Sequence, residues 1–358
     1  MASLNITSLT KHIDELRILL ANCPLDVISI NETRLEQGIL NSEIYIPGYE
    51  IVRRDRNRNG GGVCFYIKTA INYSVRTDLN INNLENLCLE IRKPNSKPFF
   101  IVTWYRPPNS PNEVFSSLEN LIGRLDSENV DFYLMGDMNC NMASMSDTNS
   151  HLLSDITDLY GLHQLINEPT RVTDTTSTLI DLIYTNYPDK VVCSGVCHVS
   201  ISDHSLIFAY RKLSIGVASK RHNTIKYRSF KNFNRDYFRS DIASQNWDAL
   251  DNFQDPNDMW REWKIKFLNV VDTHAPLRTK RVRLKRSPWI TSELKKCMHE
   301  RHIMKLKAIR SKNPQDWGEF KQLRNKVNSD IRILKESYYK QSFTENKNDS
   351  RRTYISQK

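Results

Sequence analysis

Apolar residues in the first part of the chain recur with the period of helices in three places. Between Leu9 and Leu20 they return every three or four positions after a polar start, and this spacing predicts a helix near residues 8–21. The same pattern predicts helices at Val114–Leu125 and near Leu152–Tyr160.

Short apolar runs between these helices predict strands. Phe99–Tyr105 is apolar apart from Thr103 and is stopped by Pro107-Pro108, as expected for a central strand. The alternation across Leu87–Ile91 has the period of a half-buried strand. The predicted strands are Asp26–Asn31, Val63–Ile67, Leu87–Ile91, Phe99–Tyr105, Asp131–Met135, Leu179–Tyr184 and Leu206–Tyr210. Strands that alternate with helices and include hairpin-like pairs predict a mixed α/β sandwich of about 210 residues.

The pattern changes after Arg211. Residues 214–286 have few strand signals and many charges, and two long helices are predicted from Ser287 onward. Apolar residues of the second helix, from Trp317 to Tyr338, recur at steps of three and four, which favours helix packing over base stacking. We therefore expect two domains, 1–212 and 213–358, the second mainly helical.

Charge is divided unevenly between these two parts. The 358 residues carry a net charge of +10, yet residues 1–212 have 18 basic and 25 acidic side chains, whereas 213–358 have 33 and 16. The basic part is expected to face an anionic partner. Its densest run is Arg278–Arg286, and the cations in it are Arg278, Lys280, Arg281, Arg283, Lys285 and Arg286. We predict that they contact the phosphates of DNA or RNA. The alternatives are a solvated charged surface and a nuclear localisation signal.

Composition excludes several classes of protein. A hydrophobic content of 39% is enough for a core, and no apolar run approaches the roughly 20 residues that cross a bilayer. The N-terminus does not have the pattern of a signal peptide. The seven scattered cysteines indicate reduced thiols in the nucleus or cytoplasm, with no membrane partner. Cys193, Cys197 and His198 lack a second ligand pair for zinc, so we expect them at a strand edge.

Polar side chains collect where the predicted strands end, which is where sheet proteins often place active sites. They are Asn5, Glu32, Tyr105, Arg106, Asp137, Asn139, Asp181, Asp203 and His204. Each also has an ordinary structural explanation, since Asp and Asn form turns and a single Glu is usually solvated. Asp181 lies between Ile180 and Leu182, where an unpaired carboxylate would cost several kcal/mol, and His204 is its natural partner.

This set of side chains suits phosphodiester cleavage. Carboxylate and amide oxygens are ligands for Mg²⁺, with Mn²⁺ as the alternative. Such an ion would polarise the phosphate, and a carboxylate-oriented histidine could hold or protonate a phosphoryl oxygen.

The motifs occur in a characteristic order along the chain. They are Asn5, Asn31-Glu32-Thr33, Gly60-Gly61-Gly62-Val63, Tyr105-Arg106-Pro107-Pro108, Gly136-Asp137-Met138-Asn139, Leu179-Ile180-Asp181-Leu182-Ile183 and Ser202-Asp203-His204. Over about residues 3–211, this order resembles the endonuclease/exonuclease/phosphatase superfamily. The variant looks like the apurinic-endonuclease-like nuclease of non-LTR (LINE-type) retrotransposons. The resemblance implies an α/β (α+β) four-layer, DNase-I-like sandwich: two facing mixed β-sheets with helices outside and the active site at one edge.

The resemblance also implies a metal and water site. Glu32 would be the chief metal ligand, positioned by Asn5, and Asp203 would serve the metal and its hydrogen-bond network. Asp137 would orient or activate the attacking water, with Asn139 holding water and phosphate. Because only Met1–Leu4 precede Asn5, where the family has a full apolar strand, we expect a shortened or rebuilt first strand.

A phosphate site is implied in the same way. Tyr105 would contact the scissile phosphate, and Asp181 would orient His204 toward it. Thr173 and Arg106 would add substrate contacts. The basic helical tail resembles the connector that leads into a reverse transcriptase, and no polymerase signature follows it in this sequence.

Three functions are consistent with this sequence. The first is a magnesium-dependent endonuclease that nicks DNA and leaves a 3′-hydroxyl to prime reverse transcription. The others are a phosphatase or phosphodiesterase of the same superfamily, and an inactive nucleic-acid-binding remnant. Because the surplus positive charge lies in the tail, we expect deletion of 213–358 to weaken binding more than it alters cleavage. Oligomeric state and target sequence have no signal in the chain.

Overall fold

The chain forms two compact units that differ from the two expected domains. The computed structural model describes residues 1–93, 96–144, 147–212, 224–253, 255–281 and 287–345. Contacts group Met1–Arg221 with Lys285–Lys358 as the first unit and leave His222–Leu284 as the second. The expected boundary at residue 212 therefore does not separate the units, because the two C-terminal helices pack on the α/β part.

The first sheet is built around a short strand at the start of the chain. Its six strands, in spatial order, are β13 (Val191–Cys197), β14 (Leu206–Arg211), β1 (Ala2–Asn5), β2 (Val27–Asn31), β4 (Val63–Lys68) and β3 (Tyr49–Arg54). β1 pairs in parallel with β2 and antiparallel with β14. The predicted short first strand is therefore four buried residues long and is paired on both sides.

The second sheet also mixes parallel and antiparallel pairs. Its order is β5 (Asn72–Val75), β6 (Glu85–Arg92), β7 (Phe99–Tyr105), β8 (Asp131–Asp137), β12 (Asp181–Thr185) and β9 (His163–Gln164). β7 and β8 run parallel, whereas β8 and β12 are antiparallel. All seven predicted strands are present; β12 begins at Asp181, two residues later than expected.

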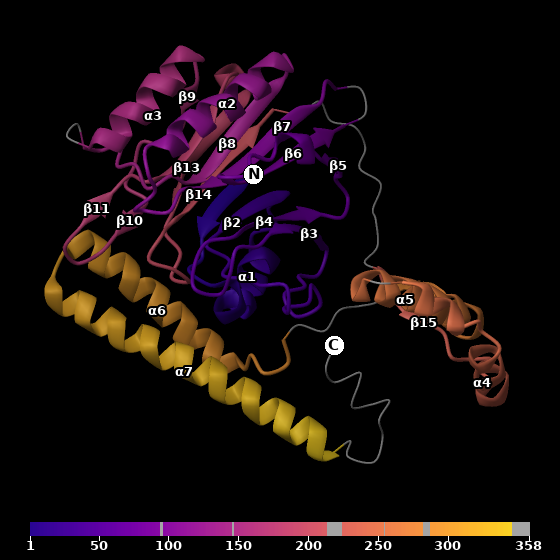
Figure 1. Cartoon of the computed structure of the whole chain (residues 1–358). Helices are drawn as coiled ribbons and strands as arrows, with labels where there is room; N and C mark the ends of the chain where they lie inside the picture. Colours follow the sequence, from indigo (N-terminus) through magenta and orange to yellow (C-terminus); the bar gives the residue numbers. More distant parts are fainter. Residues whose placement is uncertain (94–95, 145–146, 213–223, 254, 282–286, 346–358) are drawn as a thin grey trace. The chain divides into compact units, whose positions relative to one another are not determined.

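The two sheets lie between outer helices (Figure 1). α1 (Leu9–Asn22) packs on the first sheet, and α2 (Glu113–Ser127) and α3 (Thr148–Leu159) pack on the second. Side chains of β4 show the layers, because Phe65 and Ile67 enter the core shared by the two sheets, whereas Tyr66 packs with α1. The structure confirms the predicted four-layer α/β sandwich.

A long helical hairpin belongs to the same unit. It consists of α6 (Ser292–Ser311) and α7 (Pro314–Glu345), joined where Lys312 adopts a left-handed backbone conformation. Trp317, Phe320, Val327 and Ile331 of α7 are buried, and two apolar clusters join α7 to α6. The stripe on α7 packs between helices, as its spacing predicts.

The first unit also has a small two-stranded ribbon of β10 (Arg171–Val172) and β11 (Ser177–Thr178). Short 3₁₀ turns occupy Thr77–Leu79 and Pro188–Lys190. All seven cysteines are free, and Cys193 and Cys197 lie on the edge strand β13, as expected for the strand-edge alternative.

The second unit is a helical pair with a two-stranded ribbon. It contains α4 (Arg235–Ala243), α5 (Pro256–His274), the ribbon β15 (Thr224–Arg228) and β16 (Leu277–Arg281), and a 3₁₀ turn at Asp248–Asn252. Rings of Trp260, Trp263 and Phe267 stack along α5. No described helix in either unit is long and apolar enough to cross a membrane.

Candidate active site

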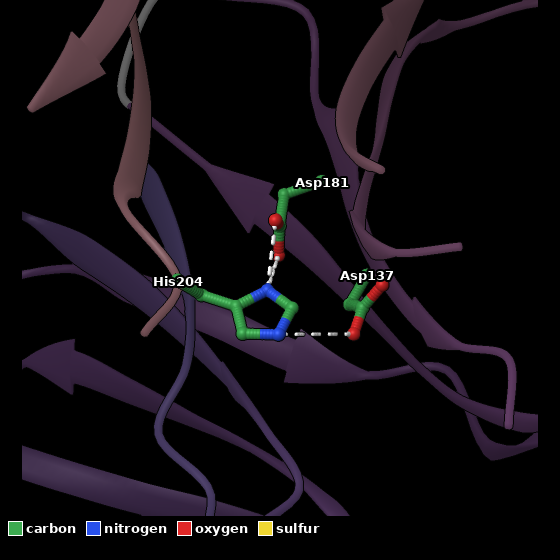
Figure 2. A group of neighbouring side chains, drawn as sticks. All are labelled: Asp137, Asp181 and His204. Carbon is green, nitrogen blue, oxygen red and sulfur yellow. Dashed lines mark hydrogen bonds and ion pairs between the residues drawn. The ribbon is translucent and has the colours of Figure 1, made fainter. Parts of the chain in front are cut away.

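Strand register brings two carboxylates and a histidine together (Figure 2). Asp181 at the start of β12 pairs directly with Asp137 at the end of β8. His204, from the loop before β14, lies beside both, and its Nδ1 is 2.9 Å from Oδ2 of Asp181 while its Nε2 is 4.0 Å from Oδ2 of Asp137. The three residues are buried. Together they could bind a metal ion, or the two carboxylates could stabilise His204 as a protonated imidazole.

Electrostatics favour the protonated imidazole. Burial alone would lower the pKa of His204, but the carboxylates of Asp181, Asp137 and Asp203 outweigh it and raise the pKa to about 9. Burial, reinforced by the charge of Asp181, raises the pKa of Asp137 to about 7. At neutral pH the imidazolium therefore donates Nδ1–H to Asp181 and keeps a second N–H at Nε2.

Asn5 connects this group to Glu32. Its Nδ2 donates to Oδ2 of Asp137 over 2.8 Å and to Oε1 of Glu32 over 3.2 Å. Tyr105 donates its hydroxyl to the same oxygen of Glu32 over 2.9 Å, and Arg34 pairs with the other oxygen at 3.0 Å. Burial opposes ionisation of Glu32, but the bonds from Arg34, Asn5 and Tyr105 lower its pKa and keep it a carboxylate.

Two of these strand-end residues have a strained backbone. Glu32 and Asn139 adopt φ angles of 50° and 45°, in the left-handed region that side chains with a Cβ rarely occupy. A strained backbone conformation persists only where contacts with the surrounding structure hold it in place. Such conformations are concentrated at functional sites. Gly136 has a φ of 145°, and a Cβ there would lie 2.1 Å from the carbonyl oxygen of Trp104. Only glycine lets the end of β8 pass so close to β7.

Asn139 and Arg106 form a support behind Asp137. The backbone N–H of Asn139 donates to Oδ1 of Asp137 over 3.1 Å, and its side chain donates to the carbonyl of Arg106 over 2.7 Å. The substrate contact expected of Arg106 stays a prediction, and in this structure its side chain lies in the protein interior. Its guanidinium is buried, donates to Asn149 and the carbonyl of Ser110, and stacks over Phe115.

Asp203 and Thr173 lie to one side of the Asp137–His204 group. The carboxylate of Asp203 pairs with Arg171 at 2.8 Å, and no bond between Asp203 and Glu32 is found among the described residues. Thr173 is in the turn of the β10–β11 ribbon, where its Oγ1 lies 2.8 Å from that of Thr176. Both line a cavity of about 350 Å³ next to the site.

The predicted nucleic-acid contacts of the basic run fall in the second unit or at its end. Arg278 is exposed at β16, and Lys280 and Arg281 continue that strand. Arg283, Lys285 and Arg286 lie outside the described residues.

Two supporting residues had no role assigned from the sequence. The buried amide of Asn31 accepts the backbone N–H of Asp137 at 3.1 Å and donates to Thr103 at 3.0 Å, which ties the two sheets together beneath the site. The hydroxyl of Thr170 accepts the N–H groups of Ile180 and Asp181 and so fixes the start of β12. Asn31 could be recognised in the sequence as the polar residue that ends an apolar strand, whereas Thr170 had no such pattern.

The family assignment follows from the comparison with family models. Residues 2–204, more than half of the chain, match the model described as the endonuclease/exonuclease/phosphatase family. The chain belongs to this family. The family indicated by the motifs is thereby confirmed, and its name places the chain among hydrolases of phosphate esters.

Solved structures with a similar fold include several nucleic-acid enzymes. The endonuclease domain of TRAS1, a telomere-specific non-LTR retrotransposon, is 17% identical, with a TM-score of 0.49, covering 60% of this chain and 98% of that chain. The 3′ phosphatase NExo from Neisseria, bound to a product DNA hairpin, is 14% identical, with a TM-score of 0.47 and coverages of 59% and 98%. An AP endonuclease from Archaeoglobus fulgidus is 13% identical, with a TM-score of 0.44 and coverages of 59% and 98%. No match was found among curated proteins.

The donor set of the site fits a hard divalent cation. Glu32 is partly exposed and ionised, and the amide of Asn5 joins it to a second carboxylate, Asp137. Oxygen donors of this kind suit Mg²⁺ or Mn²⁺ better than soft metals. A cation held there would stabilise negative charge on a phosphoryl oxygen.

Proposed function

We propose that this chain is a divalent-metal-dependent endonuclease that nicks DNA and leaves a 3′-hydroxyl. The observation that carries the proposal is the buried Asp181–His204 pair facing Asp137, with Asn5 linking Asp137 to Glu32. Membership of the endonuclease/exonuclease/phosphatase family supports hydrolysis of a phosphate ester. The order of the motifs, typical of nucleases of non-LTR retrotransposons, supports DNA as the substrate.

Each side chain then has a distinct task. Glu32 would hold Mg²⁺, positioned by the amide of Asn5, and Tyr105 would contact the scissile phosphate beside it. The imidazolium of His204 would donate its Nε2 hydrogen to a phosphoryl oxygen, because Asp181 occupies the Nδ1 side. Asp137, whose pKa is near neutral, can accept a proton from the attacking water.

Nicking of supercoiled plasmid tests the proposal. With Mg²⁺ we expect conversion to the open circle, loss of that activity with EDTA, and extension of the nick by a DNA polymerase that needs a 3′-hydroxyl. His204→Ala and Asp181→Asn should each reduce kcat by about 10²–10⁴-fold, because the first removes the N–H donor and the second removes the carboxylate that orients it. Glu32→Gln should remove the metal response.

Matched variants separate these roles from general damage. His163→Ala and Glu36→Gln change exposed residues of the same types and should keep full activity. Nicking that persists in His204→Ala and Glu32→Gln would contradict the site. Hydrolysis of a phosphate monoester without any nicking of DNA would favour a phosphatase instead.

A further inference from the structure

A buried lysine of the helical hairpin contacts the loop of residues 198–205, which carries His204 and is called the catalytic loop below. Lys305 of α6 is 2% exposed, and its Nζ donates to the carbonyl of Val199 over 2.6 Å and to that of Ser202 over 2.7 Å. A buried ammonium group is costly, so a lysine is retained in such a position when its hydrogen bonds replace hydration. The carbonyls it binds belong to the loop that carries Asp203 and His204.

A second buried cation of α6 joins the hairpin to α1. Arg301, one helical turn before Lys305, pairs with Glu15 of α1, and both side chains are 3% exposed. Asp14 of α1 accepts bonds from Ser287 and Trp289 just before α6. Lys305 is thus held by a rigid helix docked on α1, so it can restrain the loop.

The restrained backbone is immediately next to His204. Ser202, whose carbonyl Lys305 binds, accepts the backbone N–H of His204 with its Oγ over 3.2 Å. Displacement of a catalytic group by about 1 Å can cost on the order of 10²-fold in rate. Because the imidazole ring must be aimed at both Asp181 and the phosphate, the loop is a sensitive place for such a restraint.

We propose that Lys305 is a positioning residue of the nuclease, which makes the α6–α7 hairpin part of the catalytic unit. Only the expected effect on kcat depends on the proposed function; the restraint of the loop by Lys305 does not. Lys305→Met should lower kcat by about 10–100-fold with KM nearly unchanged. Lys305→Arg, which keeps a buried donor, should recover part of the loss, and the exposed-site control Lys296→Met should behave like the wild type.

Hydrogen exchange in the full chain provides a readout that does not need activity. We expect faster amide exchange across residues 199–205 in Lys305→Met, with no change there in Lys296→Met. Unchanged exchange in this loop together with wild-type kcat would overturn the proposal. An inactive wild type with the expected exchange pattern would contradict the proposed function and leave the positioning role supported.

The cavity between the hairpin and the site supports a separate inference. Its lining includes Thr173, Ser202, Asp203, Lys321, Arg324 and Asn328. Two acidic residues line the cavity, Asp203 and Asp174, and each is already paired with a cation. Asp203 pairs with Arg171, and Asp174 pairs with Lys321. Arg324 forms no ion pair with any residue that the structure describes; its recorded partners are the amide oxygen of Asn325 and the ring of Phe320.

We infer that Arg324 binds a backbone phosphate of the substrate strand on the Asp203 side of the scissile bond. An unpaired guanidinium beside compensated acids leaves a local positive charge, and its planar fork suits phosphate oxygens. This inference concerns substrate binding at the proposed site and rests on it.

Binding of a DNA duplex to the inactive His204→Ala protein tests the contact without cleavage. Arg324→Gln should weaken binding several-fold and reduce the slope of log K against log salt concentration by about one. Lys326→Gln, an exposed cation of α7 that does not line the cavity, is the matched control. Equal slopes for the two variants would overturn the assignment. DNA binding by the parent protein without nicking by the wild type would instead contradict the proposed function.

Discussion

At the scale of single residues, the site depends on backbone shape as much as on side-chain chemistry. Glu32 and Asn139 have left-handed backbone conformations, and Gly136 allows β8 to end against β7. These positions orient the carboxylates that the strand register has already brought together. Conformational strain and close packing at the strand ends are therefore part of how the site is made.

Gly136→Ala should be strongly destabilising. The new methyl group would lie 2.1 Å from the carbonyl oxygen of Trp104, at a φ of 145° that alanine rarely adopts. We expect a loss of about 3 kcal/mol in the free energy of unfolding, measured by chemical denaturation. Gly38→Ala is the control, since nothing lies within 4 Å of its added Cβ and its stability should change by less than about 0.5 kcal/mol. Equal stability of the two variants would show that β8 can shift.

At the scale of elements, the hydrophobic pattern predicted the strands whose residues are fully buried and missed strands whose residues are only partly buried. Phe99–Tyr105 is a central strand with the predicted bounds, because every position is buried and all but Thr103 are apolar or aromatic. β3, β5 and β13 were not predicted. All three lie at sheet edges and most of their residues are only partly buried, so apolar and polar positions do not alternate clearly along them.

The residues of the candidate site were easier to predict from the sequence than the contacts that hold them in place. Motif order identified Asp181 with His204, a pair that the geometry shows bonded. The substrate role of Arg106 and the metal role of Asp203 stay predictions. The sequence does not show that the guanidinium of Arg106 stacks on Phe115 in the interior or that Asp203 pairs with Arg171. The docking of the hairpin was missed for the same reason: Arg301 and Lys305 count as surface charges until their partners are known.

The Glu15–Arg301 pair predicts how hairpin docking responds to acid. Burial would raise the pKa of Glu15, but hydrogen bonds from His12 and Arg301 and the charge of Arg301 lower it overall. A lowered folded-state pKa stabilises the protein above the unfolded value of about 4.3, and this stabilisation is lost as pH falls through the folded value. Glu15→Gln should cost about 3 kcal/mol at pH 7, because Arg301 stays buried without its anion.

Denaturation across pH checks this sign. The stability difference between wild type and Glu15→Gln should shrink as pH falls below about 4.3. Glu36→Gln, at an exposed position, should track the wild type at every pH. A difference that grew toward acid would mean that Glu15 is protonated in the folded chain.

At the scale of the whole molecule, charge and packing divide the chain differently. By charge, the whole excess of basic side chains lies after residue 212, and the sandwich of residues 1–212 is net acidic. Packing assigns the hairpin to the first unit, and Ser292–Glu345 carries 13 basic and 7 acidic side chains. Part of the positive charge therefore belongs to the unit that holds the candidate active site, and only His222–Leu284 forms a separate body.

Two alterations of the chain distinguish these divisions. Replacing 222–284 with a Gly/Ser linker of equal length should leave kcat within about threefold, because both halves of the first unit keep their contacts and a flexible linker preserves their reach. Removing 213–358 should lower kcat by about 10²-fold or more, since it strips Glu15 of Arg301 and the catalytic loop of Lys305. Single-turnover nicking at saturating protein, with folding checked by circular dichroism, separates this from a loss of affinity. A folded 1–212 fragment with normal kcat and raised KM would instead support the division by charge, in which the tail binds nucleic acid and the sandwich cleaves alone.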